Sequence, residues 1–137
     1  EGWTLNVPLP AGSGDQAYQA VCQEVLLPAL DRRRPEIILV SYGFDAHYRD
    51  PLGGLQLSGQ GYYDLMKALA VWAEAHCQGR MVIVLEGGYN LKAGQVCSQG
   101  AAAGMLGEAW ADPLGPAPQK EGEDWKSVLD ELKTRRV

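Results

Sequence analysis

Residues 37–54 read IILVSYGFDAHYRDPLGG, and this stretch decides the fold. Its first four residues are a continuous apolar run, which is typical of a strand buried on both faces of a parallel sheet. The polar residues that follow belong to a loop at the carboxyl end of that strand, where open α/β sheets build their binding sites. Residues 81–90, MVIVLEGGYN, repeat the arrangement. We therefore expect the two loops to line one crevice.

Helical patterns alternate with these apolar runs. A strand is expected at 3–7, and a helix follows Asp15, whose carboxylate is placed to cap that helix. Pro28 lies late in the first helical pattern, which predicts a kink or an early end. The next helix starts at the cap residue Ser58 and runs to about His76.

The order of elements predicts the fold class. Strands at 37–41 and 81–85 are followed by helices, the second of them at 91–106, which is typical of right-handed crossovers between parallel strands. The sequence therefore predicts an α/β fold with a parallel sheet and helices on both faces. Residues 111–137 are expected to form a proline-rich connector and a terminal helix, whose apolar face is made by Trp125, Val128, Leu129 and Leu132.

The composition bounds the partners and the compartment. Twelve Lys and Arg residues stand against 17 Asp and Glu residues, for a formal net charge of -5. Nucleic acid is not an expected partner, because phosphate binding needs a basic face. No window approaches the roughly 20 apolar residues of a membrane span, so no membrane is expected either. The odd set Cys22, Cys77 and Cys97 suits reduced core thiols, which predicts a cytoplasmic protein.

The loop after the first apolar run carries the candidate ligands. Asp45 is a candidate metal ligand or general base, and the alternative is an acceptor for N–H groups of its own loop. Asp45 and His47 have chelating spacing, but a catalytic zinc needs three protein ligands. His47 therefore stays open between lining the pocket and plain loop polarity. His76 is expected to be a solvated or helix-end residue.

The second loop carries a candidate hydrogen-bond donor. Gly87 and Gly88 allow a positive φ or a close approach of the backbone to a ligand. Tyr89 follows them, and its hydroxyl is a candidate donor to an oxyanion. The alternative is a tyrosine that closes the end of the sheet. Nothing in the spacing of Glu86 makes it special, and the paired glycines alone are weak evidence for a phosphate site.

Taken together, SYGFDAHYRDPLGG (41–54) and LEGGYN (85–90) resemble two signature segments of the histone deacetylase superfamily. The similarity is to the bacterial branch of acetoin-utilization proteins, acetylpolyamine amidohydrolases and deacetylase-like amidohydrolases. NVPLPAGSGD (6–15) and DPLGPAP (112–118) extend it over nearly the whole chain. The resemblance implies the carboxyl-terminal half of an arginase-like α/β domain, which is a three-layer fold.

The resemblance also implies roles for single residues. Asp45 corresponds to a zinc ligand, and Tyr89 to the donor to the substrate carbonyl and its oxyanion. Asp50 corresponds to a carboxylate that stabilises the loop, and His47 is not a ligand. The implied cofactor is Zn²⁺, and the implied substrates are acetylated lysine, acetylated polyamine or another acyl amide.

The chain departs from the family pattern in one important way. The other two zinc ligands and the adjacent pair of histidines of the family lie upstream of the matching region, and this sequence has no adjacent histidines. Residues 1–137 are thus expected to be the carboxyl-terminal portion of a single domain and inactive alone. Two alternatives stay open. One is a non-catalytic α/β half-domain that associates through open sheet edges, and the weaker one is a small nucleotide-binding domain.

Overall fold

A computed structural model of the chain describes residues 4–134 and contains two strands and several helices. In chain order the elements are α1 (Asp15–Val21), the π-helical turn η1 (Cys22–Leu26), α2 (Leu27–Arg33), β1 (Ile38–Tyr42), α3 (Gly59–Cys77), β2 (Met81–Leu85), α4 (Leu91–Leu106) and α5 (Trp125–Thr134). The helix boundaries predicted for α3 and α4 are confirmed to within a residue. Among the described residues, no helix is both long and apolar enough to cross a bilayer.

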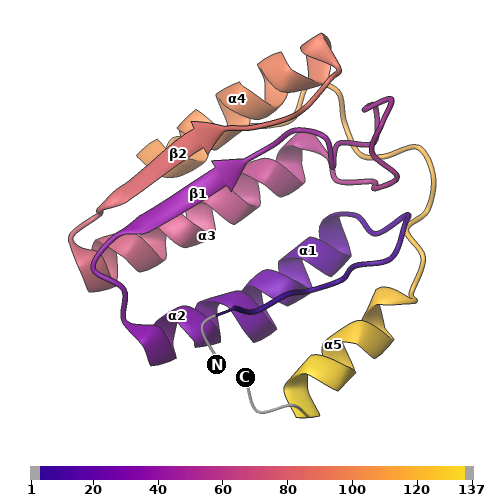
Figure 1. Cartoon of the computed structure of the whole chain (residues 1–137). Coiled ribbons are helices and arrows are strands. Elements are labelled where there is room, and N and C mark those ends of the chain that lie inside the picture. The colour runs from indigo at the N-terminus through magenta and orange to yellow at the C-terminus, as the bar shows by residue number, and fades with distance from the viewer. Residues whose placement is uncertain (1–3, 135–137) are drawn as a thin grey trace.

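The two strands are parallel and adjacent. Their register runs from Ile38 opposite Met81 to Tyr42 opposite Leu85, with α3 in the connection between them (Figure 1). Both strands therefore end at the same edge of the sheet. The predicted α/β class with a parallel sheet is confirmed.

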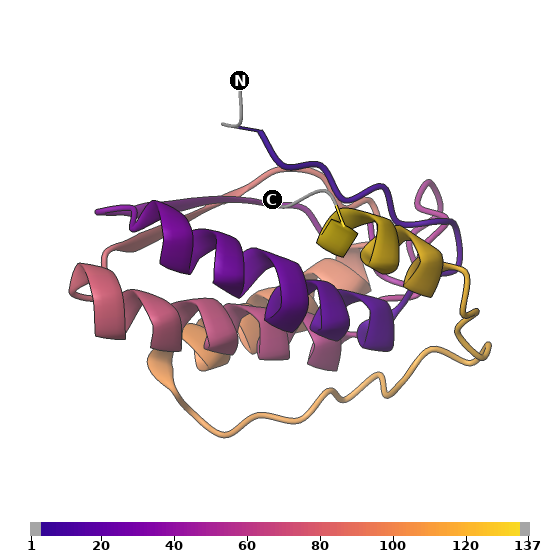
Figure 2. The same cartoon turned by 90° about the horizontal axis from the view of Figure 1, so that it is seen from below.

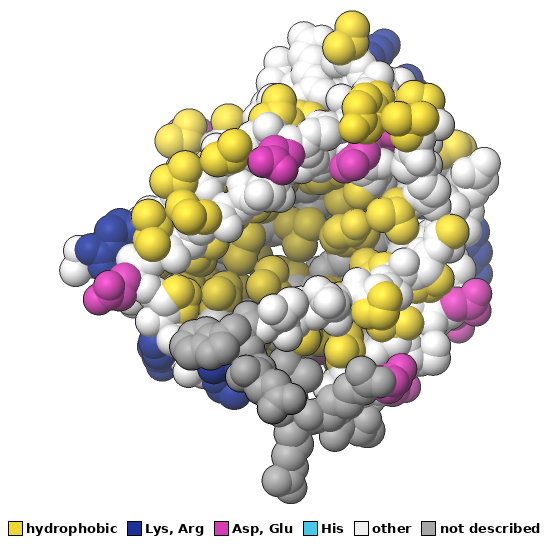
Figure 3. All heavy atoms as spheres, in the orientation of Figure 1, with side chains coloured by type: hydrophobic (Ala, Val, Ile, Leu, Met, Phe, Trp, Pro, Cys, Tyr) yellow, Lys and Arg dark blue, Asp and Glu magenta, His cyan; other side chains and the backbone are white. Residues whose placement is uncertain are grey.

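The helices cover one face of this sheet. α3 and α4 lie behind the strands, and α1 and α2 run along the β1 side (Figures 1 and 2). On the opposite face Leu39 is 71% exposed and Val84 is 52% exposed. Hydrophobic side chains gather on that face, as Figure 3 shows. The expectation of strands buried on both sides is thus wrong for residues 4–134, because no described element covers the second face.

The core lies between β1 and the helices behind it. Tyr42, Phe44 and Tyr62 pack edge to face, with ring centroids 5.1 to 5.7 Å apart, and all three are buried. This geometry is the favoured one for aromatic pairs. The cluster sits where β1 runs into its loop, so it fixes the start of that loop against α3.

Cap residues set the ends of α3. The hydroxyl of Ser58 accepts a hydrogen bond from the N–H of Gly61, as predicted for a helix cap. The helix ends at Gln78 in the left-handed region, and Gly79 follows with a positive φ. The predicted stop at this glycine is confirmed to within one residue.

The first helix starts differently from the prediction. Asp15 is the first helical residue and makes no capping bond, because Gly14 occupies the cap position. The Asp15 carboxylate instead accepts from the backbone N–H and the hydroxyl of Ser58. The free N–H groups of α1 donate to Glu121, more than a hundred residues away, and they belong to Gly14, Gln16 and Ala17. A distant carboxylate therefore caps this helix.

Pro28 neither ends nor breaks the helical run. The chain makes the π-helical turn Cys22–Leu26 just before it and continues as α2 to Arg33. Proline has no N–H and crowds the carbonyl four residues earlier, and a wider turn relieves both problems. The predicted kink thus takes the form of a π turn.

The strand predicted over residues 3–7 is wrong where it can be checked. Residues 4–7 form no strand, and Trp3 lies outside the described residues. A strand needs a neighbour to satisfy its backbone groups, and no described strand lies beside this segment.

Candidate active-site rim at the ends of β1 and β2

The loops that leave β1 and β2 touch each other. The N–H of Glu86 donates to the carbonyl of Tyr42 at 3.1 Å. A Cβ added to Gly88, whose φ is +99°, would stand 2.6 Å from the Cβ of Phe44. Any side chain at this position would therefore push the loops apart. The expected meeting of the two loops at one edge of the sheet is confirmed.

The rim is the edge of the sheet where the loops that follow β1 and β2 meet. The carboxylate of Asp45 lies at this rim. The residue is exposed, and its carboxylate lies close to the backbone of Gly87, whose φ is +84°. A Cβ added to Gly87 would stand 3.1 Å from the Oδ2 of Asp45. Burial, and next the negative charge of Asp45, raise the pKa of Tyr18, which places this α1 side chain within electrostatic reach of the carboxylate. The structure gives Asp45 no hydrogen-bond donor or ion-pair partner within residues 4–134, so the carboxylate is free to take a ligand.

Asp50 holds the backbone of Tyr89. Its Oδ2 accepts from the N–H of Tyr89 at 2.6 Å, and its Oδ1 accepts from the N–H groups of Leu52 and Gly53 at 2.9 and 3.1 Å. Asp50 is 7% exposed. One buried carboxylate therefore closes its own turn and ties the β1 loop to the β2 loop.

The environment of Asp50 favours its ionised form. Burial by itself raises the pKa of the carboxyl group, but backbone N–H groups outweigh it, with Tyr89 and Leu52 contributing most, and the pKa lies below its ordinary value. Hydrogen bonds to a carboxylate have this effect because they stabilise the charged form. Asp50 is thus an anion at neutral pH and a strong acceptor for the Tyr89 backbone.

Tyr89 itself extends into solvent and is 58% exposed. The next residue, Asn90, makes two bonds with its side chain. Its Oδ1 caps α4 by accepting from the N–H of Ala93 at 3.0 Å, and its Nδ2 donates to the carbonyl of Arg49 at 3.0 Å. The backbone that carries Tyr89 is therefore held on both sides while the phenol stays accessible.

His47 points inward. It is fully buried, its ring stacks on Tyr48 with centroids 4.4 Å apart, and its Nδ1 accepts from the N–H of Arg49. Burial lowers the pKa of His47, so the ring is neutral near pH 7. With no exposed surface, His47 supports the loop from behind the rim.

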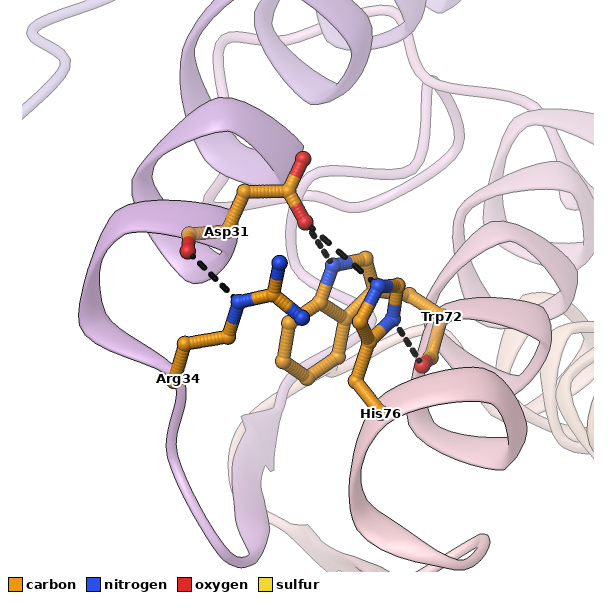
Figure 4. A network of polar contacts seen from close by, with 4 residues as sticks. All are labelled: Asp31, Arg34, Trp72 and His76. Carbon is orange, nitrogen blue, oxygen red and sulfur yellow. Dashed lines mark hydrogen bonds and ion pairs between the residues drawn. The ribbon is translucent and has the colours of Figure 1, made fainter.

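His76 lies at the other end of the sheet, in the last turn of α3. Figure 4 shows its ring stacked on Trp72, with both side chains facing Asp31. The Oδ1 of Asp31 accepts from the indole N–H of Trp72 at 2.8 Å and lies 3.8 Å from the Nε2 of His76. This network ties α2 to α3, which agrees with the helix-end role expected for His76.

Residues 4–134 do not form a complete zinc site. Within residues 4–134 no group of three His, Cys, Asp or Glu side chains is placed to hold a metal ion, whereas a catalytic zinc site needs three protein ligands. Asp45 offers one carboxylate, which lies beside Gly43 and Gly87, where a larger residue would crowd it. Asp45 is therefore a candidate for one zinc ligand, and residues 4–134 do not complete the set.

The three cysteines are buried and free, as expected. Burial raises the pKa of Cys97 to about 12, so this thiol is inert. A groove between α1 and α3 is lined by Asp15, Cys22, Asp64 and neighbouring residues. It does not include Asp45 or Tyr89, and we place the candidate site at the strand ends on chemical grounds.

Parallel strands with helices in the connections between them, and solved histone deacetylase domains as structural neighbours, define the arginase and deacetylase fold class. Residues 1–105 match the family described as "Histone deacetylase domain". The chain belongs to this family.

Relatives and solved structures agree with the assignment. The chain is 47% identical over 108 residues to "Histone deacetylase 14, chloroplastic" of Arabidopsis thaliana, a match that covers 79% of this chain and 26% of the relative. It is 45% identical over 89 residues to the "Histone deacetylase-like amidohydrolase" of Pseudomonas aeruginosa, which covers 65% and 23%. The solved HDA15 HD domain superposes with a TM-score of 0.80 at 29% identity, over 98% of this chain and 35% of that one. The chain spans about a quarter of the length of these curated relatives.

Sequence reasoning missed several residues that support the rim. Asn90 carried a local signal, because an asparagine directly before a helical pattern is a good cap. Glu121 and Tyr48 carried none, since their partners lie more than sixty residues away. Tyr89, Asp45 and Asp50 stand where the two loops meet, and their catalytic or ligand roles remain predictions.

Proposed function

We propose that this chain supplies the carboxyl-terminal part of the active site of a zinc-dependent deacetylase-type amidohydrolase. One observation carries the proposal: the unpartnered carboxylate of Asp45 and the accessible phenol of Tyr89 stand on touching loops at the ends of adjacent parallel strands. Membership of the histone deacetylase domain family supports the reaction class. The expected substrates are acetylated lysine, acetylated polyamines or other acyl amides, as in the bacterial acetoin-utilization and amidohydrolase branch.

Each residue has a distinct task in this proposal. The Tyr89 hydroxyl donates a hydrogen bond to the oxyanion that forms from the acyl carbonyl, since a phenol is a neutral donor. Asp50 fixes the backbone of Tyr89, so the donor is oriented before the reaction starts. Asp45 supplies one oxygen ligand for zinc. When bound, zinc would provide Lewis-acid activation of the carbonyl and of the attacking water.

Neither histidine of the chain is placed to act as a general base at the rim. His47 is buried behind the loop, and His76 lies at the opposite end of the sheet. The base and the remaining zinc ligands are therefore expected from polypeptide outside this chain, and the 137 residues alone are expected to be inactive. The cytoplasmic location remains a prediction.

The test is a deacetylation assay on a protein that joins this chain to the rest of the domain, with acetyl-lysine peptide and acetylated polyamine as substrates. Tyr89→Phe should lower kcat by about 10²–10³, the typical cost of one oxyanion donor. Asp45→Ala should weaken zinc binding. Robust zinc-dependent turnover by the 137 residues alone, or full activity in Tyr89→Phe, would contradict the proposal.

A second candidate, the non-catalytic association module, is favoured by the exposed apolar face of the sheet. This alternative predicts concentration-dependent self-association of the chain without any zinc-dependent activity in the complete protein. Sedimentation together with the deacetylation assay separates the two functions.

A further inference from the structure

The connector, residues 107–124, runs from α4 to α5 past the loop that leaves β1 (Figure 1). It contacts the amino-terminal ends of two helices. The Oδ2 of Asp112 accepts from the N–H of Gln60 at the start of α3, and Glu121 caps α1. A helix that alternates with parallel strands runs in the opposite direction to them, so it starts at the edge of the sheet where the strands end. The starts of α1 and α3 therefore lie at the edge that carries the candidate site. The connector is therefore fixed beside that site.

The connector also contacts the Asp45 loop, residues 43–54. The hydroxyl of Tyr48 donates to the carbonyl of Leu114 at 3.0 Å. The N–H of Tyr48 donates to the carbonyl of Leu57, and the N–H of Leu57 donates to the carbonyl of Ala46. Only Ala46 and His47 separate Tyr48 from Asp45, and the Tyr48 ring stacks on buried His47. The hydrogen bond from Tyr48 to the connector thus restrains the segment that carries Asp45.

Asp45 depends on such support because its side chain has no partner of its own in the described residues. The direction of its carboxylate is set by the backbone of the loop. Removing a residue that holds a metal ligand in place typically lowers metal affinity or activity ten- to a hundredfold. The matched family region ends at residue 105, so the tether comes from a part of the chain outside it.

We propose that Tyr48 is a positioning residue, and that the connector is a strap that holds the Asp45 loop through the bond from Tyr48 to Leu114. The strap is a property of this fold. Its consequence for zinc and catalysis rests on the proposed function.

The chain offers a closely matched control in Tyr63 on α3. The Tyr63 hydroxyl also donates to a carbonyl of the connector, that of Glu108, at 3.0 Å. Each hydroxyl has a cationic neighbour, with Arg49 Nε at 3.3 Å from Tyr48 and Lys67 Nζ at 3.4 Å from Tyr63. Each cation also lies over its ring, at 5.6 and 5.5 Å from the centroid. Tyr48→Phe and Tyr63→Phe therefore remove the same kinds of hydroxyl hydrogen bond and keep the ring, and only the first change is in the Asp45 loop.

The first experiment is amide hydrogen exchange on the 137-residue chain. Tyr48→Phe should speed exchange at the N–H groups of His47 and Asp50 about fivefold, the factor that corresponds to one net hydrogen bond of about 1 kcal/mol. Tyr63→Phe should leave these two groups at the wild-type rate. Unchanged exchange in Tyr48→Phe, or an equal increase in Tyr63→Phe, overturns the strap.

The second experiment measures zinc affinity of the complete protein by competition with a chelator. Tyr48→Phe should weaken zinc binding about tenfold, and Tyr63→Phe should not change it. Equal affinities in the two variants overturn the positioning role of Tyr48. An Asp45→Ala variant that binds zinc normally overturns the proposed function instead, and the exchange experiment still decides the strap by itself.

Discussion

At the scale of single residues, some side chains of the rim hold the loop backbone by hydrogen bonds, and others are available to bind a ligand. Asp50 is buried and accepts hydrogen bonds from several backbone N–H groups, whereas the side chains of Asp45 and Tyr89 have no hydrogen-bond or ion-pair partner among residues 4–134. A carboxylate that is ionised by its hydrogen bonds stabilises the fold only while it remains charged. The difference in stability between wild type and an Asp50 variant, followed across pH, therefore reports on this carboxylate.

Replacing Asp50 by asparagine should destabilise the chain by about 2 kcal/mol near pH 7, because the N–H of Tyr89 loses a charged acceptor. The folded-state pKa of Asp50 is depressed, so its contribution is present above the unfolded pKa of about 3.9 and is lost as the pH falls through the lower folded value. Urea unfolding from pH 7 down to pH 3 measures the difference, which should shrink below about pH 4.

The control is Asp64→Asn on the exposed side of α3, which should change stability little at any pH. A constant gap between wild type and Asp50→Asn across this range would show that Asp50 acts through packing and not through its charge.

Sequence patterns located the residues of the rim but not the contacts that hold them. Asp45 and Tyr89 were predicted at one edge because each follows an apolar run, and the parallel register confirms that placement. The capping role of Asp15 was wrong because the helix starts one residue earlier than its side chain requires. A one-residue shift of this kind is set by the distant partner Glu121, which no local pattern reveals.

At the scale of elements, α4 packs against α3 through a small-residue face. A Cβ added to Gly104 would stand 2.7 Å from the carbonyl oxygen of Tyr63 and 3.0 Å from the N–H nitrogen of Lys67. A Cβ added to Gly94 would meet only Phe44, at an ordinary 3.6 Å. The closest approach of α4 at Gly104 is therefore to the backbone of α3.

Replacing each of the two glycines by alanine should change the stability of the chain in opposite directions. Gly104→Ala is expected to destabilise the chain by about 1–3 kcal/mol, because the added methyl group forces the helices apart. Gly94→Ala is expected to stabilise it by about 0.5–1 kcal/mol, because alanine is the better helix former. Thermal and urea unfolding of both variants check this pair, and a loss of stability in both would contradict the packing described here.

The cap on α1 is the second prediction for an element. Glu121→Ala removes the acceptor for three N–H groups at the start of that helix and should cost about 1–2 kcal/mol. Glu123→Ala is the matched control, since Glu123 is exposed and only pairs with Lys126. Equal unfolding midpoints for the two variants would mean that the cap contributes nothing.

At the scale of the whole molecule, the uncovered face of the sheet is the main feature that needs a partner. On this face Leu39 lies opposite Val82 and Ser41 lies opposite Val84 in the register of the two strands, and Leu39, Val82 and Val84 are all exposed. Continuous apolar runs predicted strands buried on both faces, and the described residues bury only one. An apolar face of this kind is expected to be covered in the functional protein.

This face should bind a hydrophobic dye and drive association of the isolated chain. Leu39→Lys and Val84→Lys should each reduce dye fluorescence and self-association at little cost in stability, because both positions are already exposed. Ser41→Lys, on the same face, is the control for added charge. A sedimentation profile that stays monomeric for the wild-type chain at high concentration would contradict this expectation.

The central claim is that Asp45 and Tyr89 act on one bound acyl amide. A crystal structure of the complete protein with zinc and a hydroxamate analogue of acetyl-lysine tests it most directly. We expect an anomalous zinc peak about 2.0–2.2 Å from a carboxylate oxygen of Asp45, with the Tyr89 hydroxyl about 2.5–3.0 Å from the ligand carbonyl oxygen. A zinc peak remote from Asp45, or a Tyr89 ring turned away from the ligand, would contradict it.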